Sequence, residues 1–380
     1  MSVSGDYGIV NQIEFQGRSF AGASVSNYGV VQTGDVVYTK SPLNSNPYGI
    51  IKTNKGKPGI VSTLYAVYHP KENAFSDFIQ VYFEQHARMN NYMHPLVNKG
   101  AKNDMKVSAE NALKGPVCFP SRIEQESISA FFSVLDNLIT LHQRKFEKLT
   151  NVKKSMLEKM FPQNGCSYPE IRFKGFTDAW EQRKLGELVD RVVRKNTNNE
   201  STLPLTISAQ YGLVDQITYF NNRVASRDVS NYYLVLNGEF AYNKSTSDGY
   251  PFGAVKRLDL YEKGVLSTLY IVFSPKKEQQ VDSDFLTVFF DTDRWHKGVA
   301  ERAAEGARNH GLLNISAEDF FDIDLSVPKD VAEQKQIGAF IRQLDNLITL
   351  HQRQPFLHSP PDISLIVQLP LIIPTNGCNH

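Results

Sequence analysis

The segment LDNLITLHQR occurs twice in the chain, at 135–144 and again at 344–353. Ten identical consecutive residues so far apart indicate an internal repeat, because chance does not produce such a match. Leucine and isoleucine recur in the segment at three- and four-residue steps, which is the spacing of one face of an α-helix. The chain therefore contains the same helical segment in two places.

The repeat extends well beyond these ten residues. YGIVNQIEF (7–15) matches YGLVDQITY (211–219), SNYGVVQTGDVVYTKS (26–41) matches SNYYLVLNGEFAYNKS (230–245), and STLYAVYHP (62–70) matches STLYIVFSP (267–275). Shorter matches follow at GAKN (100–103) and GARN (306–309). We infer two copies of one unit, each with a globular part followed by a helix.

The globular parts alternate short β-rich runs with turns, which predicts an α+β (mixed α/β) domain with a mixed sheet. VVQTGDVVYTK (30–40) and LVLNGEFAYNK (234–244) predict β-hairpins with Gly in the turn. The apolar runs at 59–69 and 264–274 predict further strands. Segments 77–97 and 284–304 predict helices capped by Asp77 and Asp284.

A long amphipathic helix is predicted over 121–161, between Pro120 and Pro162. Its apolar stripe comprises Ile128, Phe131, Leu135, Leu138, His142, Leu149, Val152, Met156 and Met160. At 1.5 Å per residue such a helix is about 60 Å long. The second copy begins the same pattern over 331–353, with Leu344, Leu347 and His351. We predict an antiparallel coiled-coil pair; the alternative is that each helix packs only on its own domain.

Composition limits the function classes. The chain has 380 residues, enough for two or three domains, and a formal net charge of +1. Neither a basic-then-apolar leader nor an apolar run of membrane-spanning length is apparent, so we expect a cytoplasmic protein without a membrane partner. Cys118, Cys166 and Cys378 lie far apart without CxxC spacing, which argues against a zinc site or a disulfide framework.

Two similar but non-identical modules joined by rigid helices fit a protein that reads two sites at a fixed separation. Double-stranded DNA is such a ligand, because a spacer of about 60 Å spans more than one helical turn and protein geometry sets half-site spacing. The rival hypothesis is a two-module protein-interaction scaffold that dimerises through its coiled coil.

Three segments carry a resemblance to a known family: KLTNVKKSMLEKMFP (148–162), PEIRFKGFTDAWEQRKLGEL (169–188) and EQKQIGAFIRQLDNLITLHQR (333–353). They resemble the specificity subunit of type I restriction–modification systems, and the resemblance covers about residues 1–353. It implies two target-recognition domains, each reading half of a bipartite DNA site, with two long helices as spacer. It also implies a non-catalytic chain that docks methyltransferase and restriction subunits, to which S-adenosylmethionine, ATP and Mg belong.

The repeat and the resemblance together predict domain boundaries. We expect a first target-recognition domain at 1–120, a spacer helix at 121–161, a second recognition domain at 162–330, a second spacer helix at 331–353 and a non-homologous tail at 354–380. Residues 176–205 precede the repeated part of the second copy, and the first copy has no such segment before Met1. The tail at 354–380 follows the second LDNLITLHQR but does not resemble 145–162, which follow the first. We therefore expect a first domain truncated at its N-terminus, a truncated second helix and an incomplete or cassette copy of the subunit.

Candidate DNA contacts are donors in turns that recur in both copies. They are Lys40, Ser41, Lys102, Asn103, Lys244, Ser245, Arg308 and Asn309. Arg can bind guanine and Asn adenine in bidentate fashion, while Lys and Ser hold phosphates. The alternative is that these are ordinary solvated turn residues.

The helices offer candidate spacer and docking residues instead of catalytic ones. These are Leu135, Leu138, His142, Leu344, Leu347 and His351, with the histidines interpreted as polar positions that set the register. The Lys-rich run 144–154 is interpreted as a solvated helix face. NSNPYG (44–49) lacks the second proline of an adenine-methyltransferase box, so no residue is assigned to catalysis and none to a metal.

Overall fold

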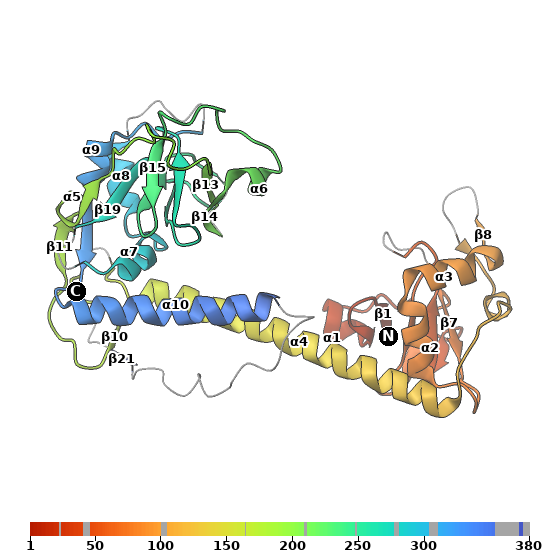
Figure 1. Ribbon diagram of the computed structural model, residues 1–380. Helices are drawn as coiled ribbons and strands as arrows, with labels where there is room; N and C mark the ends of the chain where they lie inside the picture. Colours follow the sequence, from red (N-terminus) through yellow and green to blue (C-terminus); the bar gives the residue numbers. More distant parts are fainter. Residues whose placement is uncertain are drawn as a thin grey trace. The chain divides into compact units, whose positions relative to one another are not determined.

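The computed structural model describes residues 1–380 except 23, 41–45, 100–104, 164, 209–210, 248, 277–280, 304–310, 354–371 and 375–380. The chain divides into two compact units, 1–141 and 142–380. The division falls inside the long helix α4 (Arg122–Lys159), so each unit contains about half of that helix (Figure 1). Both units combine antiparallel strands with helices, which confirms the expected mixed α/β class. The expected mixed sheet is wrong for the described strands, because every ladder between them is antiparallel.

Unit 1 contains small antiparallel sheets. Their strand orders are β1 (Ser2–Ser4)–β2 (Gly8–Val10), β3 (Gly29–Val31)–β6 (Gly59–Val61), β5 (Ile51–Thr53)–β4 (Val36–Thr39)–β7 (Tyr65–Tyr68) and β8 (Asn98–Lys99)–β9 (Met105–Lys106). The helices are α1 (Gln12–Gln16), α2 (Ser76–Glu84), α3 (His86–Met93) and the first half of α4, with 3-10 turns at His94–Leu96 and Asn111–Leu113. Apolar side chains of β4, β5 and α3 form the main core.

Unit 2 is built around the four-stranded sheet β12 (Val189–Arg191)–β19 (Ile271–Pro275)–β16 (Phe240–Asn243)–β17 (Ala254–Arg257). Two-stranded sheets pair β10 (Ile171–Phe173) with β21 (Ile372–Pro374), β11 (Glu181–Lys184) with β20 (Asp324–Val327), β13 (Leu205–Ser208) with β14 (Gly212–Asp215) and β15 (Tyr233–Leu236) with β18 (Lys263–Leu266). Its helices are α5 (Leu185–Leu188), α6 (Gln216–Phe220), α7 (Ser283–Phe290), α8 (His296–Arg302), α9 (Ala317–Phe321) and α10 (Val331–Arg353).

The strand pairing within the two units follows the same scheme. β4 lies between β5 and β7 in unit 1, as β16 lies between β17 and β19 in unit 2. β3 pairs with β6 as β15 pairs with β18, and in each unit a two-stranded sheet precedes a short helix capped by an Asn or Asp side chain. Unit 2 adds β12, which lies within residues 176–205. This segment has no counterpart in the first copy of the repeat.

The two predicted hairpins are wrong in their pairing, although their strands exist. β15 and β16 flank the turn at Gly238, but each pairs in a different sheet. The Glu239 carboxylate accepts from the Leu236 amide at 2.8 Å, and the Gly238 amide donates to the Leu258 carbonyl at 2.8 Å. The turn is thus held by a side chain and by a distant carbonyl instead of by the two flanking strands. Gly34 and Asp35 repeat the arrangement in unit 1.

Each of the helices predicted at 77–97 and 284–304 is divided in two. Gln85 has extended backbone (φ −73°, ψ 108°) between α2 and α3. In unit 2 the hydroxyl of Thr292 donates to the Phe289 carbonyl at 2.6 Å and the Trp295 indole to the Phe290 carbonyl at 3.2 Å. These bonds use carbonyls at the end of α7, so the helix stops there.

The predicted caps are also wrong. Asp282, not Asp284, caps α7, because its carboxylate accepts from the amides of Asp284 and Phe285. Phe75 occupies the cap position of α2 without a side-chain hydrogen bond, and Asp77 lies in the first turn. A carboxylate inside the first turn still favours the helix through the dipole.

The two long helices are confirmed as helices, with α4 within two residues of the predicted 121–161 and α10 at the predicted 331–353. Leu149, Val152 and Met156 of α4 pack against the unit 2 core. That core includes Ile337 and Leu344 of α10. Cys118 is free and exposed, whereas Cys166 is disulfide-bonded, contrary to the expectation from cysteine spacing.

We predict that Gly253→Ala destabilises unit 2 by more than about 2 kcal/mol. Gly253 has φ +77°, and a Cβ would lie 2.1 Å from the Asn243 carbonyl oxygen. A left-handed conformation alone costs a residue with Cβ about 1–2 kcal/mol, and the clash adds to it. Gly238→Ala is the matched control, since φ is +84° with open space around the Cβ. Chemical denaturation should show the larger loss at Gly253; equal losses would contradict the prediction.

Candidate nucleic-acid interface

In unit 2 the end of β16 is joined to the segment that follows the GARN motif. The Thr246 amide donates to the Gly311 carbonyl at 2.8 Å, and the Leu313 amide donates to the Lys244 carbonyl at 3.0 Å. Ser245 forms an isolated antiparallel bridge with Leu312. The YNKS motif and residues 311–313, which follow GARN in the sequence, thus meet at one edge of unit 2.

Lys244 and Ser245 are positioned as surface donors of this edge. The Lys244 side chain is half-buried, and its ammonium donates to the Ile315 carbonyl at 3.3 Å. An ammonium has three donors, so two remain for a ligand. Ser245 is exposed, and its amide donates to the Asn243 side chain at 3.0 Å. The edge can therefore present a cation and a hydroxyl side by side.

The other predicted contacts are less completely described. Lys40 follows β4 in unit 1, is half-buried, and donates its amide to the Leu64 carbonyl at 3.1 Å. Ser41, Lys102, Asn103, Arg308 and Asn309 lie outside the described residues. In the sequence, Lys102 and Asn103 fall between β8 and β9, and Arg308 and Asn309 between α8 and Gly311.

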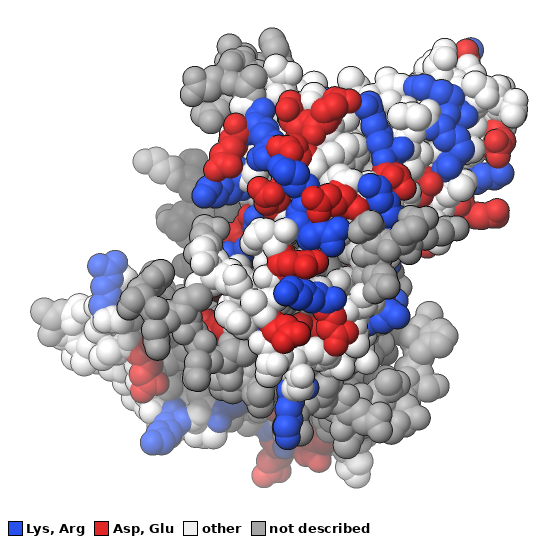
Figure 2. All heavy atoms as spheres, turned by 90° about the vertical axis from the view of Figure 1, so that its left-hand side faces the viewer, with Lys and Arg blue, Asp and Glu red and all other residues white. Residues whose placement is uncertain are grey.

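Charge on the surface is mixed. On the face shown in Figure 2, Lys and Arg side chains alternate with Asp and Glu side chains, and no large area of a single sign gathers among the described residues. Many charged side chains of unit 2 are paired, for example Arg191 with Glu318 at 3.0 Å and Arg302 with Asp322 at 2.8 Å. On the face shown, the described residues therefore offer individually placed donors and no broad basic surface.

The second half of α4 contacts α10 in unit 2. His142 Nδ1 lies 3.0 Å from His351 Nδ1, with ring centroids 5.2 Å apart. Lys153 of α4 meets Asp345 of α10 at 2.7 Å. Because later residues of α4 meet earlier residues of α10, the two helices run antiparallel there (Figure 1).

The histidine contact makes protonation unfavourable. Burial lowers the pKa of His351 below its ordinary value of 6.5, and the positive charges of His142 and Lys145 lower it further. A neutral pair shares one hydrogen bond between the two Nδ1 atoms, whereas two imidazolium rings would repel each other.

The other predicted helix residues differ in exposure. Leu344 is buried in the unit 2 core, and Leu347 is half-buried. Leu135 is half-buried, whereas Leu138 is 46% exposed. The identical segments therefore lie in different environments, with the copy in α10 covered and the copy in α4 open.

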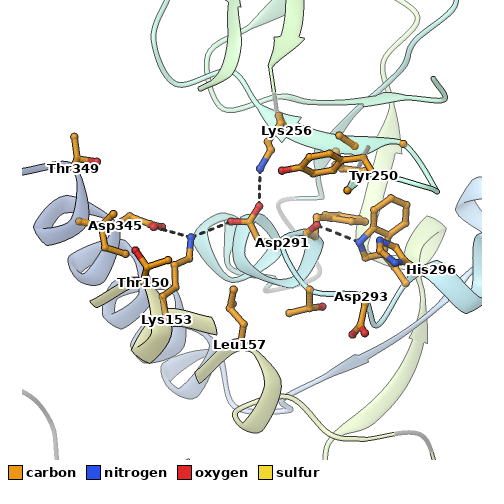
Figure 3. A pocket seen from close by; sticks show the side chains of 18 of the residues that line it. Thr150, Lys153, Leu157, Tyr250, Lys256, Asp291, Asp293, His296, Asp345 and Thr349 are labelled. Carbon is orange, nitrogen blue, oxygen red and sulfur yellow. Dashed lines mark hydrogen bonds and ion pairs between the residues drawn. The ribbon is translucent and has the colours of Figure 1, made fainter. Parts of the chain in front are cut away.

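A four-charge cluster, missed by the sequence analysis, lies beside this contact. Lys153 contacts both Asp345 at 2.7 Å and Asp291 at 3.6 Å, and Lys256 contacts Asp291 at 2.7 Å (Figure 3). The Lys153 side chain is only 20% exposed, so the interpretation of 144–154 as a wholly solvated face is wrong at this residue. Burial lowers the pKa of Lys153, but the two carboxylates outweigh it and raise the pKa above the ordinary value.

The cluster lines a cavity of about 880 Å³ in unit 2. Phe146, Thr150, Lys153 and Leu157 of α4 form one wall, and Asp345, Ile348 and Thr349 of α10 form another. Lys256, Asp291 and Trp295 line it from the domain side. One sequence signal for this site is the three- and four-residue spacing of the α4 wall.

Neither a metal centre nor a membrane-spanning helix is found among the described residues. No group of three or more His, Cys, Asp or Glu side chains there could hold a metal ion. No helix in that part of the chain is both long and apolar enough to cross a membrane.

Comparison with known proteins identifies one segment. Residues 177–355 match the family model described as "Type I restriction modification DNA specificity domain". No curated protein matches the chain. Among solved structures, the HsdS subunit from Thermoanaerobacter tengcongensis is 14% identical, with a TM-score of 0.45 over 87% of this chain and 78% of that chain. A structure described as "Structural basis underlying complex assembly andconformational transition of the type I R-M system" is 14% identical, with a TM-score of 0.41 over 87% and 79%.

We predict that unit 2 loses stability as the pH falls below the ordinary histidine value. Because the pKa of His351 is lower in the folded protein than 6.5, the unfolded chain binds the proton first, and acid favours unfolding. The denaturation midpoint should be lower at about pH 5.5 than at about pH 7.5. His351→Asn should remove part of this dependence, and His86→Asn, at an exposed position of α3, should keep all of it. An unchanged dependence in His351→Asn would contradict the prediction.

Proposed function

Because residues 177–355 match the family model of the type I restriction modification DNA specificity domain, we propose that the chain is the DNA sequence-recognition subunit of a type I restriction–modification enzyme. It reads a bipartite duplex site with two half-site domains in tandem repeat, bounded as expected at 1–120 and 162–330. The family match is the observation that carries this proposal. The shared strand scheme of the two units supports the extension from one domain to two.

The two long helices are proposed as the coiled-coil spacer between the half-site domains. α4 has 38 residues, which at 1.5 Å per residue corresponds to about 57 Å. Its antiparallel contact with α10 at His142 and Lys153 supports a paired rod. Leu135, Leu138, Leu344 and Leu347 would contribute to that rod and to the surface on which partner subunits dock.

The edge at Lys244 and Ser245 is proposed as part of the DNA contact of unit 2. Hydrogen bonds from Thr246 and Leu313 hold it next to Gly311, which follows Arg308 and Asn309 in the sequence. Lys40, Ser41, Lys102 and Asn103 are the corresponding proposal for unit 1. Lys and Ser would hold phosphates, while Arg and Asn would read base edges.

Catalysis is proposed to belong to other chains. The subunit would dock methyltransferase subunits for DNA methylation and restriction subunits for cleavage. Those partners would carry S-adenosylmethionine, ATP and Mg, and the assembly would work in the cytoplasm. The chain itself would determine which DNA sequence is recognised and how far apart the two half-sites lie.

The test is selection from a random duplex pool. The chain is purified with its methyltransferase partner, bound DNA is recovered, and the enriched sequences are aligned. Two short conserved blocks separated by a constant unspecified gap would support the proposal. Protein partners retained without any DNA preference would instead support the two-module interaction scaffold and overturn DNA recognition.

We predict different effects for a phosphate contact and a base contact. Lys244→Ala should weaken binding equally for all sequences and lower the salt slope by about one. Arg308→Ala should cost about 1–3 kcal/mol and relax the preference at one base pair. Lys174→Ala, at an exposed lysine after β10, is the control and should change neither. Fluorescence anisotropy at several salt concentrations measures all three; a normal slope and affinity in Lys244→Ala would remove that residue from the interface.

A further inference from the structure

Unit 1 contains a groove that corresponds to the four-charge cavity of unit 2. The groove measures about 420 Å³, and Lys52, Glu84, Asp136, Ile139 and Thr140 are among the residues that line it. Lys52 contacts Glu84 at 2.6 Å, as Lys256 contacts Asp291 at 2.7 Å in unit 2.

The correspondence holds residue by residue. Asp136, Ile139 and Thr140 occupy the same places in LDNLITLHQR as Asp345, Ile348 and Thr349. Lys52 lies on β5 opposite Val37 of β4, as Lys256 lies on β17 opposite Ala241 of β16. The same helix segment and the same strand thus form two sides of both sites.

One side differs between the two sites. In unit 2 a helix closes the cavity with Phe146, Thr150, Lys153 and Leu157, spaced four, three and four residues apart. In unit 1 every described lining residue belongs to 1–141, and the remaining side is the β1–β2 turn at 5–9. Tyr7 of that turn lines the groove and is 70% exposed.

Exposure of the repeated helix reflects this difference. Phe132 is 42% exposed, whereas Ile341 at the same place in α10 is fully buried. Ile139 is 47% exposed, whereas Ile348 is half-buried. A run of apolar side chains on a solvated helix indicates a surface that another element covers.

Charge distinguishes the two sites in the same way. The unit 2 cluster has two lysines and two aspartates, because Lys153 comes from the closing helix. The unit 1 groove has Lys52, Glu84 and Asp136 at the corresponding places, and Asp136 has no ion pair among the described residues. The lining also includes Asp6 and Lys55, and Lys55 contacts Asp77 at 3.5 Å. One additional lysine, at the place that Lys153 takes in unit 2, would pair with Asp136.

We propose that this groove of unit 1 is a docking site for a basic amphipathic helix of another polypeptide. The helix carries an aromatic residue, Thr, Lys and Leu at the spacing of Phe146, Thr150, Lys153 and Leu157. Its lysine lies between Glu84 and Asp136, and its apolar side chains cover Ile139 and its neighbours. Residues 142–159 of this chain already occupy the unit 2 site, so that segment of the same molecule is not free to fill the groove. The proposal does not depend on DNA recognition.

The test uses a fluorescent peptide with the sequence of residues 142–162, titrated with the full chain and followed by anisotropy. We expect saturable one-to-one binding, weakened about tenfold or more in a Lys153→Glu peptide. Asp136→Lys in the chain should reverse the preference between the two peptides. Glu124→Lys, at an exposed position of the same helix, should leave both affinities unchanged. Asp345→Asn, which alters the occupied site, should also leave them unchanged.

Three outcomes would overturn the proposal. The wild-type peptide could fail to bind a chain whose circular dichroism shows it to be folded. Glu124→Lys could weaken binding as much as Asp136→Lys, which would indicate general charge attraction. Binding could appear only after deletion of 354–380, which would assign the groove to the chain's own tail.

Discussion

The arrangement of unit 2 depends on covering the apolar face of one long helix. An isolated amphipathic helix gains little from its own backbone, so its stability comes from the surface it packs against. α4 packs Leu149, Val152 and Met156 onto the unit 2 core, and α10 contributes Leu344 to the same core. The Lys153 ammonium makes this contact more specific, because its position must satisfy the carboxylates of both Asp345 and Asp291. Packing supplies the free energy, and the charges select one register.

The sequence predicted elements better than their pairing. The limits of α4 and α10 followed from apolar periodicity and flanking prolines, which are local properties of the chain. The sheet partners of β15 and β16 did not follow, because a Gly turn between two strands looks the same whether they pair or enter different sheets. The hydrogen bond from the Leu236 amide to the Glu239 carboxylate distinguishes the two cases, and it is evident only in the folded structure.

The candidate sites show the same limit. Lys244 and Ser245 were found from recurring motifs, but their proximity to 311–313 depends on hydrogen bonds between distant segments. Lys153 was assigned to a solvated face, because its partners Asp291 and Asp345 are more than a hundred residues away. A comparison of the two repeats would have given a signal: Lys52 and Lys256, and Glu84 and Asp291, recur at matching places.

The anchoring of the segment after β16 has an evolutionary consequence. The Tyr242 hydroxyl donates to the Phe252 carbonyl at 2.9 Å, and Gly253 brings its backbone against Asn243, so the loop 244–252 starts and ends at fixed points. Tyr38, Tyr48 and Gly49 repeat the anchor in unit 1. Substitutions and small insertions between such fixed points leave the sheet undisturbed and cost little closure entropy. Natural variation can therefore explore new loop sequences there while foldability is retained.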